Sequence, residues 1–185
     1  IGGPLGVAAL VLKRGLDLTP VLHGGGQERE IRSGTLNAPA IVAFTAAAEY
    51  AIANMESNFE KIRELRDYFI AGLKKCVPDV SINSVSDPAL PGIVNATFPG
   101  TESDALLLLL DTEGISASAG SACSAGVPRP SHVLVALGLS ESDADASLRI
   151  SIGTTNTKSE IDQVLAVMPS VVERARNAFV VSELN

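Results

Sequence analysis

Between residues 38 and 76 apolar side chains recur every three or four positions, which is the spacing of one face of an α-helix. Glu and Lys or Arg are interleaved in the EKIRELRDYF part of this stretch, where oppositely charged pairs three or four positions apart stabilise a helix. Pro78 follows, and proline cannot continue a helix. The pattern predicts one long helix, or two in series, that ends just before this proline.

Beyond Pro78, short apolar runs alternate with amphipathic stretches. The predicted strands are residues 80–82, 93–98, 115–117 and 148–152, and the predicted helices are residues 102–112, 131–137 and 159–178. Two of these helices have start signals: Pro130 and Ser131 precede HVLVAL, and Thr157 is followed three positions later by Glu160, as in a capping box. This order predicts an α/β or α+β layer, in which helices cover a sheet.

The apolar run at residues 7–12 predicts a strand of a different kind. It is rich in branched side chains and lies between Gly6 and the Lys13-Arg14-Gly15 turn, so we expect it to be buried on both faces. Such a strand needs neighbours, and the few residues before it provide none. We therefore expect it to pair with another chain or with a further part of the protein. Residues 22–36, which are rich in glycine and polar side chains, predict a loop.

Composition narrows the function classes. The chain has 185 residues, 46% of them hydrophobic and 19% charged, which is typical of a globular protein of one or two domains. A net charge of -7 without any cluster of Lys and Arg argues against a nucleic-acid-binding surface. Cys76 and Cys123 lie far apart and predict neither a metal site nor a disulfide, so a reducing cytoplasm is the expected location.

The apolar runs and the N-terminus give further expectations about membrane segments and leaders. No apolar run approaches the roughly 20 residues that a membrane-spanning helix requires, and IGGPLGVAAL lacks the basic start of a signal peptide. We expect neither a membrane segment nor a leader. The chain does not begin with Met, so we also expect it to be a piece of a longer protein.

A glycine-rich segment is the first candidate for chemistry. It reads HGGGQE from His23 and continues after a short gap with Arg32, Ser33, Gly34 and Thr35. Consecutive glycines expose backbone N–H groups, and a nearby guanidinium and hydroxyl suit an anion such as phosphate. On spacing alone, a flexible surface loop is the favoured interpretation.

Cys123 is the second candidate. It lies in SASAGSACSAG, a run of very small side chains that leave a thiol accessible and its backbone mobile, as a nucleophile that moves between partners requires. A buried structural cysteine in a tightly packed place is the alternative. Arg129 and His132 are the nearest cations in sequence.

Arg149 is the third candidate, a charge within the apolar strand LRISI. A guanidinium that points into a site can bind a carboxylate through two hydrogen bonds. The alternative is an arginine on the solvated face of a half-buried strand. A fourth segment, GGPLG at the start of the chain, is by itself only a tight turn.

In order and spacing, these segments resemble the cysteine desulfurases of the NifS and IscS type, which are class V enzymes of the aminotransferase fold. The resemblance runs from Ile1 to about Arg176, and HGGGQE with RSGT, GSAC and LRISIG are its most specific parts. It implies a pyridoxal-phosphate-dependent enzyme that takes sulfur from L-cysteine, releases alanine and supplies the sulfur to iron-sulfur cluster assembly or thio-modification. No metal is implied.

The resemblance also implies roles for individual residues. Cys123 takes the sulfur as a persulfide, and Arg149 holds the substrate carboxylate. Thr35 binds the cofactor phosphate of the other subunit of a homodimer, and its cofactor-binding neighbours are Gly34, Arg32 and His23. A sulfur-acceptor or scaffold protein is the implied partner. Cys76 matches no functional position and is expected to be structural.

For the fold, the resemblance implies the C-terminal small domain of a fold-type I transferase, an α/β layer with a sheet covered by helices. We expect this domain at residues 48–185, preceded at 1–47 by a remnant of the large cofactor domain. In relatives the GGP turn directly follows the lysine that binds the cofactor, so the resemblance places that lysine just before Ile1. The isolated chain is therefore expected to be inactive.

Two alternatives stay open at this point. One is a catalytically silent domain that dimerises or carries sulfur on Cys123; sulfide release from cysteine by this chain would exclude it. The other is a relative that acts on selenocysteine or cysteine sulfinate, or an aminotransferase. Replacing Cys123 with Ala separates the aminotransferase, which needs no sulfur acceptor.

Overall fold

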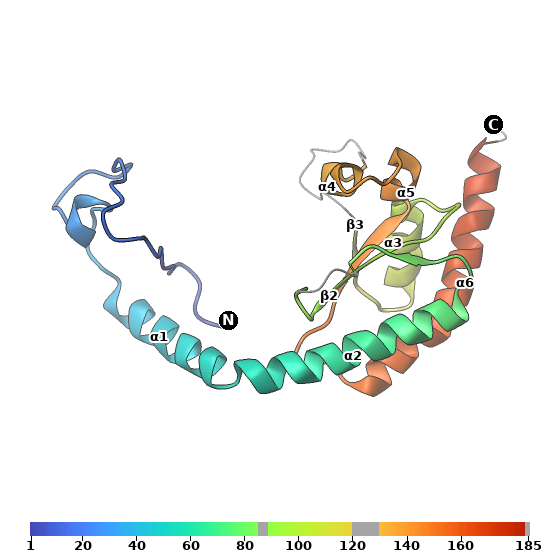
Figure 1. Cartoon of the computed structure of the whole chain (residues 1–185), viewed down its shortest axis with the longest axis horizontal. Coiled ribbons are helices and arrows are strands. Elements are labelled where there is room, and N and C mark those ends of the chain that lie inside the picture. Colours follow the sequence, from blue (N-terminus) through green and yellow to red (C-terminus); the bar gives the residue numbers. More distant parts are fainter. Residues whose placement is uncertain (85–88, 120–129, 184–185) are drawn as a thin grey trace. The chain divides into compact units, whose positions relative to one another are not determined.

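The computed structural model describes residues 1–84, 89–119 and 130–183, the last four of these by their backbone only (Figure 1). The chain divides into two compact units, Ile1–Glu56 and Ser57–Asn185. Each unit is described below by itself. The expected boundary near residue 48 stays a prediction.

The first unit contains little regular structure. It has one short 3-10 helix, η1 (Glu28–Glu30), and one α-helix, α1 (Ala38–Ala53). Asn37 caps α1 by accepting a hydrogen bond from the backbone N–H of Ala40 at 3.3 Å, and Pro39 occupies the first turn, where a missing N–H costs nothing. None of the residues of α1 is buried within this chain.

The predicted strand at residues 7–12 is wrong for this chain. The segment forms no strand, and its side chains are largely in solvent, with Leu10 72% and Val11 93% exposed. A strand requires a hydrogen-bonded neighbour, and among the described residues none lies beside it. Whether it pairs with another chain or a further part of the protein stays a prediction.

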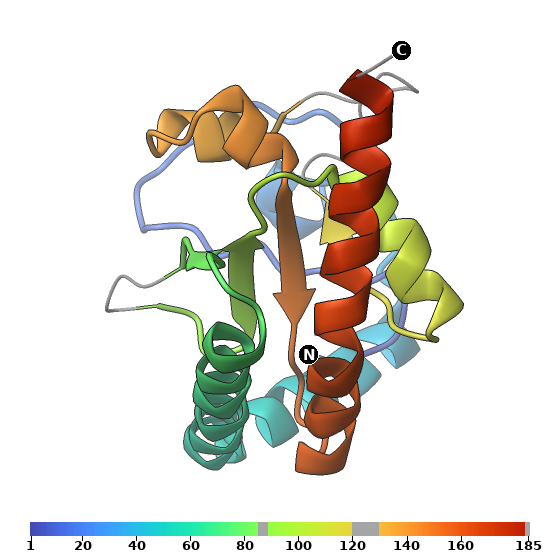
Figure 2. The ribbon, with the colours of Figure 1, turned by 90° about the vertical axis from the view of Figure 1, so that its right-hand side faces the viewer.

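The second unit is a four-stranded antiparallel sheet covered by helices (Figure 2). Its strands are β1 (Ser81–Ile82), β2 (Ile93–Thr97), β3 (Ser118–Ala119) and β4 (Ser147–Ser151), in the order β1-β2-β4-β3. Its helices are α2 (Met55–Cys76), α3 (Ser103–Thr112), α4 (His132–Ala136), α5 (Glu141–Asp145) and α6 (Lys158–Glu183). A sheet covered by helices was the predicted layer.

The core lies on one face of this sheet. Val94 and Ala96 of β2 and Leu148 of β4 point into it, fully buried. The helices α2, α3 and α6 contribute the rest, with side chains such as Phe69, Leu106 and Met168. Because side chains alternate along a strand, the intervening residues of β2 and β4 lie on the opposite face.

Most predicted elements of this unit are confirmed. The stretch 38–76 forms two helices in series, and the strands in β2 and β4 lie within one residue of their predicted ends. The strand predicted at 115–117 forms instead at Ser118–Ala119, where it can pair with Leu148 and Arg149. The helix α5 was not predicted, because ESDAD has no apolar periodicity.

No single helix of the described residues is long and apolar enough to cross a bilayer; only α1 and α2 taken together meet those criteria, by length and composition.

Candidate active site

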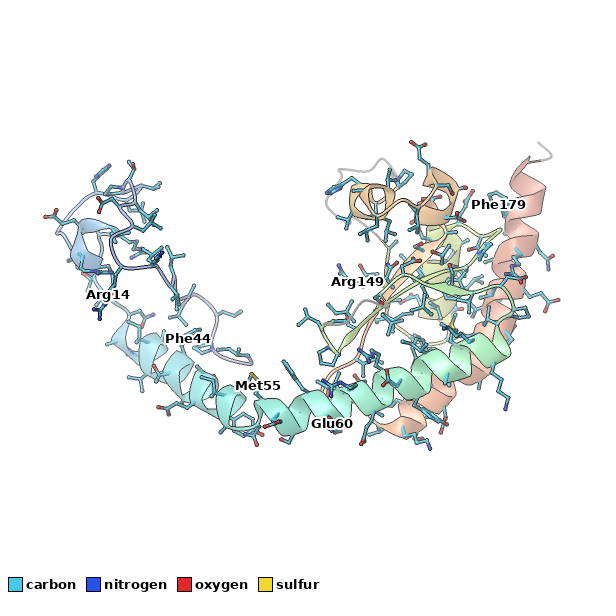
Figure 3. All side chains as sticks on the ribbon, viewed as in Figure 1. Arg14, Phe44, Met55, Glu60, Arg149 and Phe179 are labelled. Carbon is cyan, nitrogen blue, oxygen red and sulfur yellow. The ribbon has the colours of Figure 1, made fainter. Side chains whose placement is uncertain are left out.

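Arg149 lies in the middle of the sheet, on the face away from the core. Its neighbours in β4, Leu148 and Ile150, are buried or half-buried, whereas its own side chain is exposed (Figure 3). One of its terminal nitrogens donates a 3.3 Å hydrogen bond to the hydroxyl of Ser118 in β3. Among the described side chains no carboxylate forms an ion pair with it. The guanidinium is therefore held at one end and has donors left for an anion.

A row of polar residues crosses this face of the sheet at the level of Arg149. Asn95 of β2 is the cross-strand partner of Arg149, and Ser118 of β3 is its partner on the other side. Asn83, one residue beyond β1, completes the row and donates a 2.6 Å hydrogen bond from its side-chain amide to the side-chain oxygen of Asn95. We call Asn83, Asn95, Arg149 and Ser118 the polar row.

A second, buried row lies beside the first. Thr97 and Ser147 are 1% and 2% exposed, and their hydroxyl oxygens are 2.7 Å apart. Ser147 donates to the backbone carbonyl of Asp143 at 2.6 Å, and Asn83 donates to the Thr97 hydroxyl at 2.8 Å. This chain of hydrogen bonds ties Asn83, at one end of the polar row, to α5 and so restricts the Asn83 side chain.

The glycine-rich segment folds into a closed loop within the first unit. The backbone N–H of Ser33 donates to the carbonyl of Leu22 at 3.3 Å, and the Ser33 hydroxyl accepts from Gly26 N–H at 3.3 Å. The side-chain oxygen of Gln27 accepts from Gly34 N–H at 2.9 Å. These contacts between the two halves of the segment explain why Ser33 is buried although it lies in a loop.

This loop presents its predicted site residues to solvent. His23, Arg32 and Thr35 are all exposed, and among the described residues no hydrogen bond uses the Thr35 hydroxyl. Gly34 has a φ of 127°, a conformation that side chains rarely adopt, and a Cβ there would lie 3.0 Å from the Arg32 guanidinium. A hydroxyl, a guanidinium and an imidazole on one short loop are donors that suit a phosphate.

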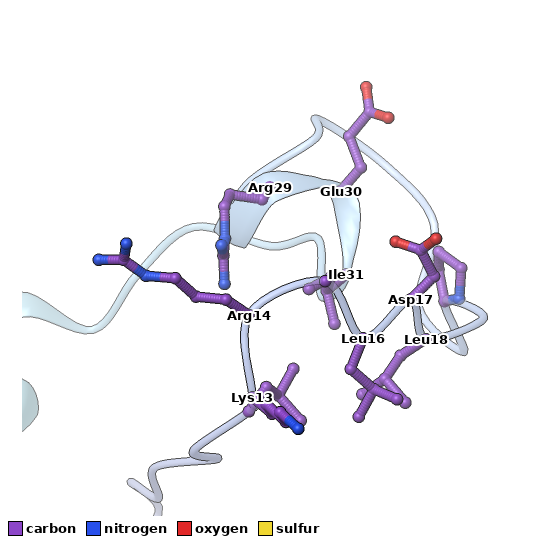
Figure 4. A pocket seen from close by; sticks show the side chains of 11 residues that line it. Lys13, Arg14, Leu16, Asp17, Leu18, Arg29, Glu30 and Ile31 are labelled. Atoms are coloured by element: carbon purple, nitrogen blue, oxygen red, sulfur yellow. The ribbon is translucent and has the colours of Figure 1, made fainter.

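A separate hollow of about 680 Å³ lies in the same unit (Figure 4). It is lined mainly by residues 12–18 together with Arg29, Glu30 and Ile31. Three basic side chains, Lys13, Arg14 and Arg29, face it alongside two acidic ones. It includes none of the predicted site residues.

Of the two cysteines, the structure describes only Cys76. Cys123 lies outside the described residues, so the structure gives no geometry for its thiol. Cys76, at the end of α2, is half-buried, and its sulfur lies 3.7 Å from the carbonyl of Leu73. Burial raises the pKa of the Cys76 thiol above its usual range, which disfavours the reactive thiolate.

Residues 1–164 match the family model described as aminotransferase class-V. The chain belongs to this family. Membership of this family implies pyridoxal phosphate as the cofactor.

The names of similar proteins support this family assignment. It is 47% identical over 178 residues to an IscS-like cysteine desulfurase from Mycobacterium tuberculosis, an alignment that covers 96% of this chain and 45% of that protein. Among solved structures, a NifS-like protein from Rickettsia africae superposes with a TM-score of 0.75 at 34% identity, over 85% of this chain and 41% of that one. SspA in complex with cysteine gives a TM-score of 0.52 at 33% identity, over 76% and 37%.

The chain thus spans less than half the length of the curated relatives it matches.

The sequence prediction named Arg149 but none of its neighbours in the polar row. Alternation alone could have found Asn95 and Thr97 in IVNAT, since both fall on the polar face of that strand. It could not have found Asn83 and Ser118, because strand pairing places Asn83 beside Asn95 and Ser118 beside Arg149.

Proposed function

We propose that this chain is the C-terminal part of a cysteine desulfurase, which takes sulfur from L-cysteine and leaves it as a persulfide on Cys123. The observation that carries the proposal is Arg149, an exposed guanidinium with no carboxylate partner among the described residues, at the centre of the sheet of a class-V chain. An amino-acid substrate brings the carboxylate that such a guanidinium binds.

In this proposal, two residues of the chain act directly on the substrate, Arg149 and Cys123. Arg149 binds and orients the substrate carboxylate. The Cys123 thiolate attacks the sulfur of the substrate; the new S–S bond forms as the substrate C–S bond breaks. The electron pair of that bond passes to the carbon fragment, which takes up a proton and leaves as alanine. Pyridoxal phosphate, when bound, supplies the electron sink for this carbon fragment.

The glycine-rich loop fits the phosphate of that cofactor. We propose that the Thr35 hydroxyl and the Arg32 guanidinium hold it, with His23 as a further donor. The N–H of Gly34 is already bound to Gln27, so Gly34 acts through its positive φ, which allows the chain to pass close to Arg32. The predicted cofactor lysine, just before Ile1, belongs to the same proposal.

The principal experiment uses the whole enzyme with pyridoxal phosphate and L-cysteine, and measures alanine and sulfide. Cys123→Ala is expected to lower desulfuration on the order of 1000-fold, since the nucleophile is lost. Cys76→Ala, the matched cysteine control, is expected to keep the wild-type rate. Equal release of alanine and sulfide by wild type and Cys123→Ala would contradict the proposal.

We further propose a homodimer in which Thr35 serves the partner's site. Many apolar side chains of the first unit are exposed in the single chain, among them Leu5, Val11 and Val21, which supports a covering partner. A mixed dimer of Thr35→Ala and Cys123→Ala chains tests this. If Thr35 acts across the dimer, one site of the mixed dimer is intact and about half the wild-type activity returns. If Thr35 acts within its own chain, neither site is intact.

The sulfur acceptor is proposed to be a scaffold or carrier protein of iron-sulfur assembly or thio-modification, and the cytoplasm is the proposed location. Acceptance of ³⁵S from labelled Cys123 by a purified scaffold protein would test the first of these.

A further inference from the structure

The polar row contains a second hydrogen-bond donor beside Arg149. Asn95 and Arg149 face each other across β2 and β4. Hydrogen bonds from Ile152 N–H to Gly92 carbonyl and from Phe98 N–H to Ala146 carbonyl show which pairs in this ladder are hydrogen-bonded. Asn95 and Arg149 belong to the other, alternate set, whose side chains lie closer together, with Cβ atoms about 4.5–5.5 Å apart.

The direction of every hydrogen bond in the buried row follows from counting protons. Ser147 gives its hydroxyl proton to the carbonyl of Asp143, which can only accept. Ser147 must therefore accept from Thr97, and Thr97 has no further proton to give. Asn83, which contacts the Thr97 hydroxyl, must then present its NH₂ group there rather than its oxygen.

This count fixes the orientation of Asn95. The same NH₂ group of Asn83 also contacts the side chain of Asn95, so Asn95 must present its oxygen to Asn83. If Asn95 were turned over, two NH₂ groups would face each other without an acceptor. Because β2 lies between β1 and β4, an amide oxygen turned toward Asn83 turns the Asn95 NH₂ away from β1, toward the side of Arg149.

We propose that the side-chain NH₂ of Asn95 donates a second hydrogen bond, beside Arg149, to the carboxylate of the substrate. This inference rests on the proposed function and adds a specificity residue to the same site. Among the described residues no acceptor takes a proton from the Asn95 NH₂, and the residues of β2 and β4 on this face include no acid. Two donors from adjacent strands suit the two oxygens of a carboxylate.

Equilibrium binding of L-alanine to the full-length holoenzyme tests the proposal without relying on turnover, with ethylamine as the ligand that lacks a carboxylate. Asn95→Ala is expected to raise the dissociation constant of L-alanine about tenfold, the loss of one hydrogen bond to a charged group. The dissociation constant of ethylamine is expected to stay within twofold. An unchanged affinity for L-alanine, or an equal loss for both ligands, would overturn the inference.

Asn95→Asp is the second variant and keeps the shape of the side chain and its oxygen toward Asn83. It replaces the donor with an anion, so L-alanine binding is expected to weaken further, on the order of 100-fold. This variant decides the matter if Asn95→Ala does not fold, as judged by its melting temperature; L-alanine binding by Asn95→Asp as tight as in wild type would overturn the inference. Gln163→Ala, an exposed amide on α6, is the matched control and is expected to bind both ligands as wild type does.

The outcome separates this inference from the desulfurase proposal. If wild type binds L-alanine in an Asn95-dependent way but releases no sulfide from L-cysteine, the desulfurase fails and the carboxylate site stands. If wild type releases sulfide while Asn95→Ala binds L-alanine normally, the desulfurase stands and Asn95 has no part in recognising the substrate.

Discussion

Single residues decide how closely the segments of the second unit approach. A Cβ at Gly92 would lie 2.6 Å from the carbonyl oxygen of Ile152, which is backbone at the end of β4 and cannot move aside as a side chain can. The carbonyl of Gly92 also accepts a hydrogen bond from the N–H of Ile152 at 2.8 Å, so the backbones of these two residues are in direct contact. Glycine at this position lets β2 and β4 meet.

Gly92→Ala is accordingly expected to lower the free energy of unfolding by about 1–3 kcal/mol, through overpacking against backbone. Chemical denaturation of the two proteins measures this difference. Gly153→Ala is the control at the same end of β4, because its nearest neighbour there, the Asn156 side-chain oxygen, is 3.9 Å away. Equal losses in the two variants would show that the approach to Ile152 is not the cause.

Cys76 shows how burial distinguishes a structural thiol. Since burial raises its pKa, little thiolate is present near pH 8, and alkylation is expected to be several-fold slower than that of free cysteine. Iodoacetamide modification of a Cys123→Ser variant, followed by mass spectrometry, measures Cys76 alone. Denaturation should restore the rate of free cysteine; equally fast modification of the folded protein would contradict the burial.

Among the elements, α6 begins with the capping box that its sequence predicts. The Glu160 carboxylate accepts from the Thr157 backbone N–H at 2.7 Å and from its hydroxyl at 3.1 Å, and Glu160 N–H donates back to Thr157 at 3.3 Å. The Thr157 backbone N–H, then its hydroxyl, lowers the pKa of Glu160 below the usual value. Folding therefore favours the charged carboxylate.

A lowered pKa gives stability that is present above the unfolded pKa of about 4.3 and is lost as the pH falls through the folded pKa. Glu160→Gln is expected to lower the melting temperature at pH 7, and the difference is expected to shrink below about pH 4. Thermal unfolding across this range measures it. Glu173→Gln, an exposed glutamate later in α6, should stay within about 1 °C of wild type at pH 7. A Glu160→Gln difference that is constant with pH would rule out the carboxylate as its source.

The pKa of Asp145, at the end of α5, is shifted in the opposite direction to that of Glu160. Burial, and then the charge of Asp104 in α3, raise the pKa of its carboxyl. A raised pKa means that folding favours the protonated form, so the ionised form costs stability once the pH exceeds the folded pKa. Asp145→Asn is expected to raise the melting temperature at pH 7 and to have little effect near pH 3. A decrease at pH 7 would contradict this account.

The elements of the second unit could largely be predicted from the sequence, because each carries its own periodicity or start signal. The strand at residues 7–12 could not be judged in the same way. Its apolar pattern predicts burial, but burial requires a neighbour, and a local pattern contains no information on whether that neighbour is present. For the same reason the sequence identified Arg149 but not Asn83 or Ser118, whose places in the polar row depend on the pairing of β1 with β2 and of β3 with β4.

At the scale of the whole molecule, the two units differ in how much of their apolar surface is covered. The second has a closed core between its sheet and three helices, whereas the first exposes most of its large apolar side chains. Small surface patches are ordinary, but an apolar segment of this extent is typical of a surface that another polypeptide covers.

Amide exchange of the 185-residue chain, verified as a monomer, tests this difference. Residues 7–12 form no strand and are expected to exchange within seconds, whereas β2 and β4 should be protected many orders of magnitude longer. Slow exchange at 7–12 in a monomer would refute the prediction that the segment needs a partner. Protection that appears only in the full-length enzyme would support it.

The strand β4 gives its alternate residues to two different tasks, Leu148 and Ile150 to the core and Arg149 to the polar row. A slip of one position against β2 would turn the guanidinium into the hydrophobic layer and two aliphatic side chains into water. A misaligned molecule thus forfeits its stability and its ligand together. In any preparation, an active-site titration should therefore count the correctly folded fraction, with no weakly binding subpopulation between the two.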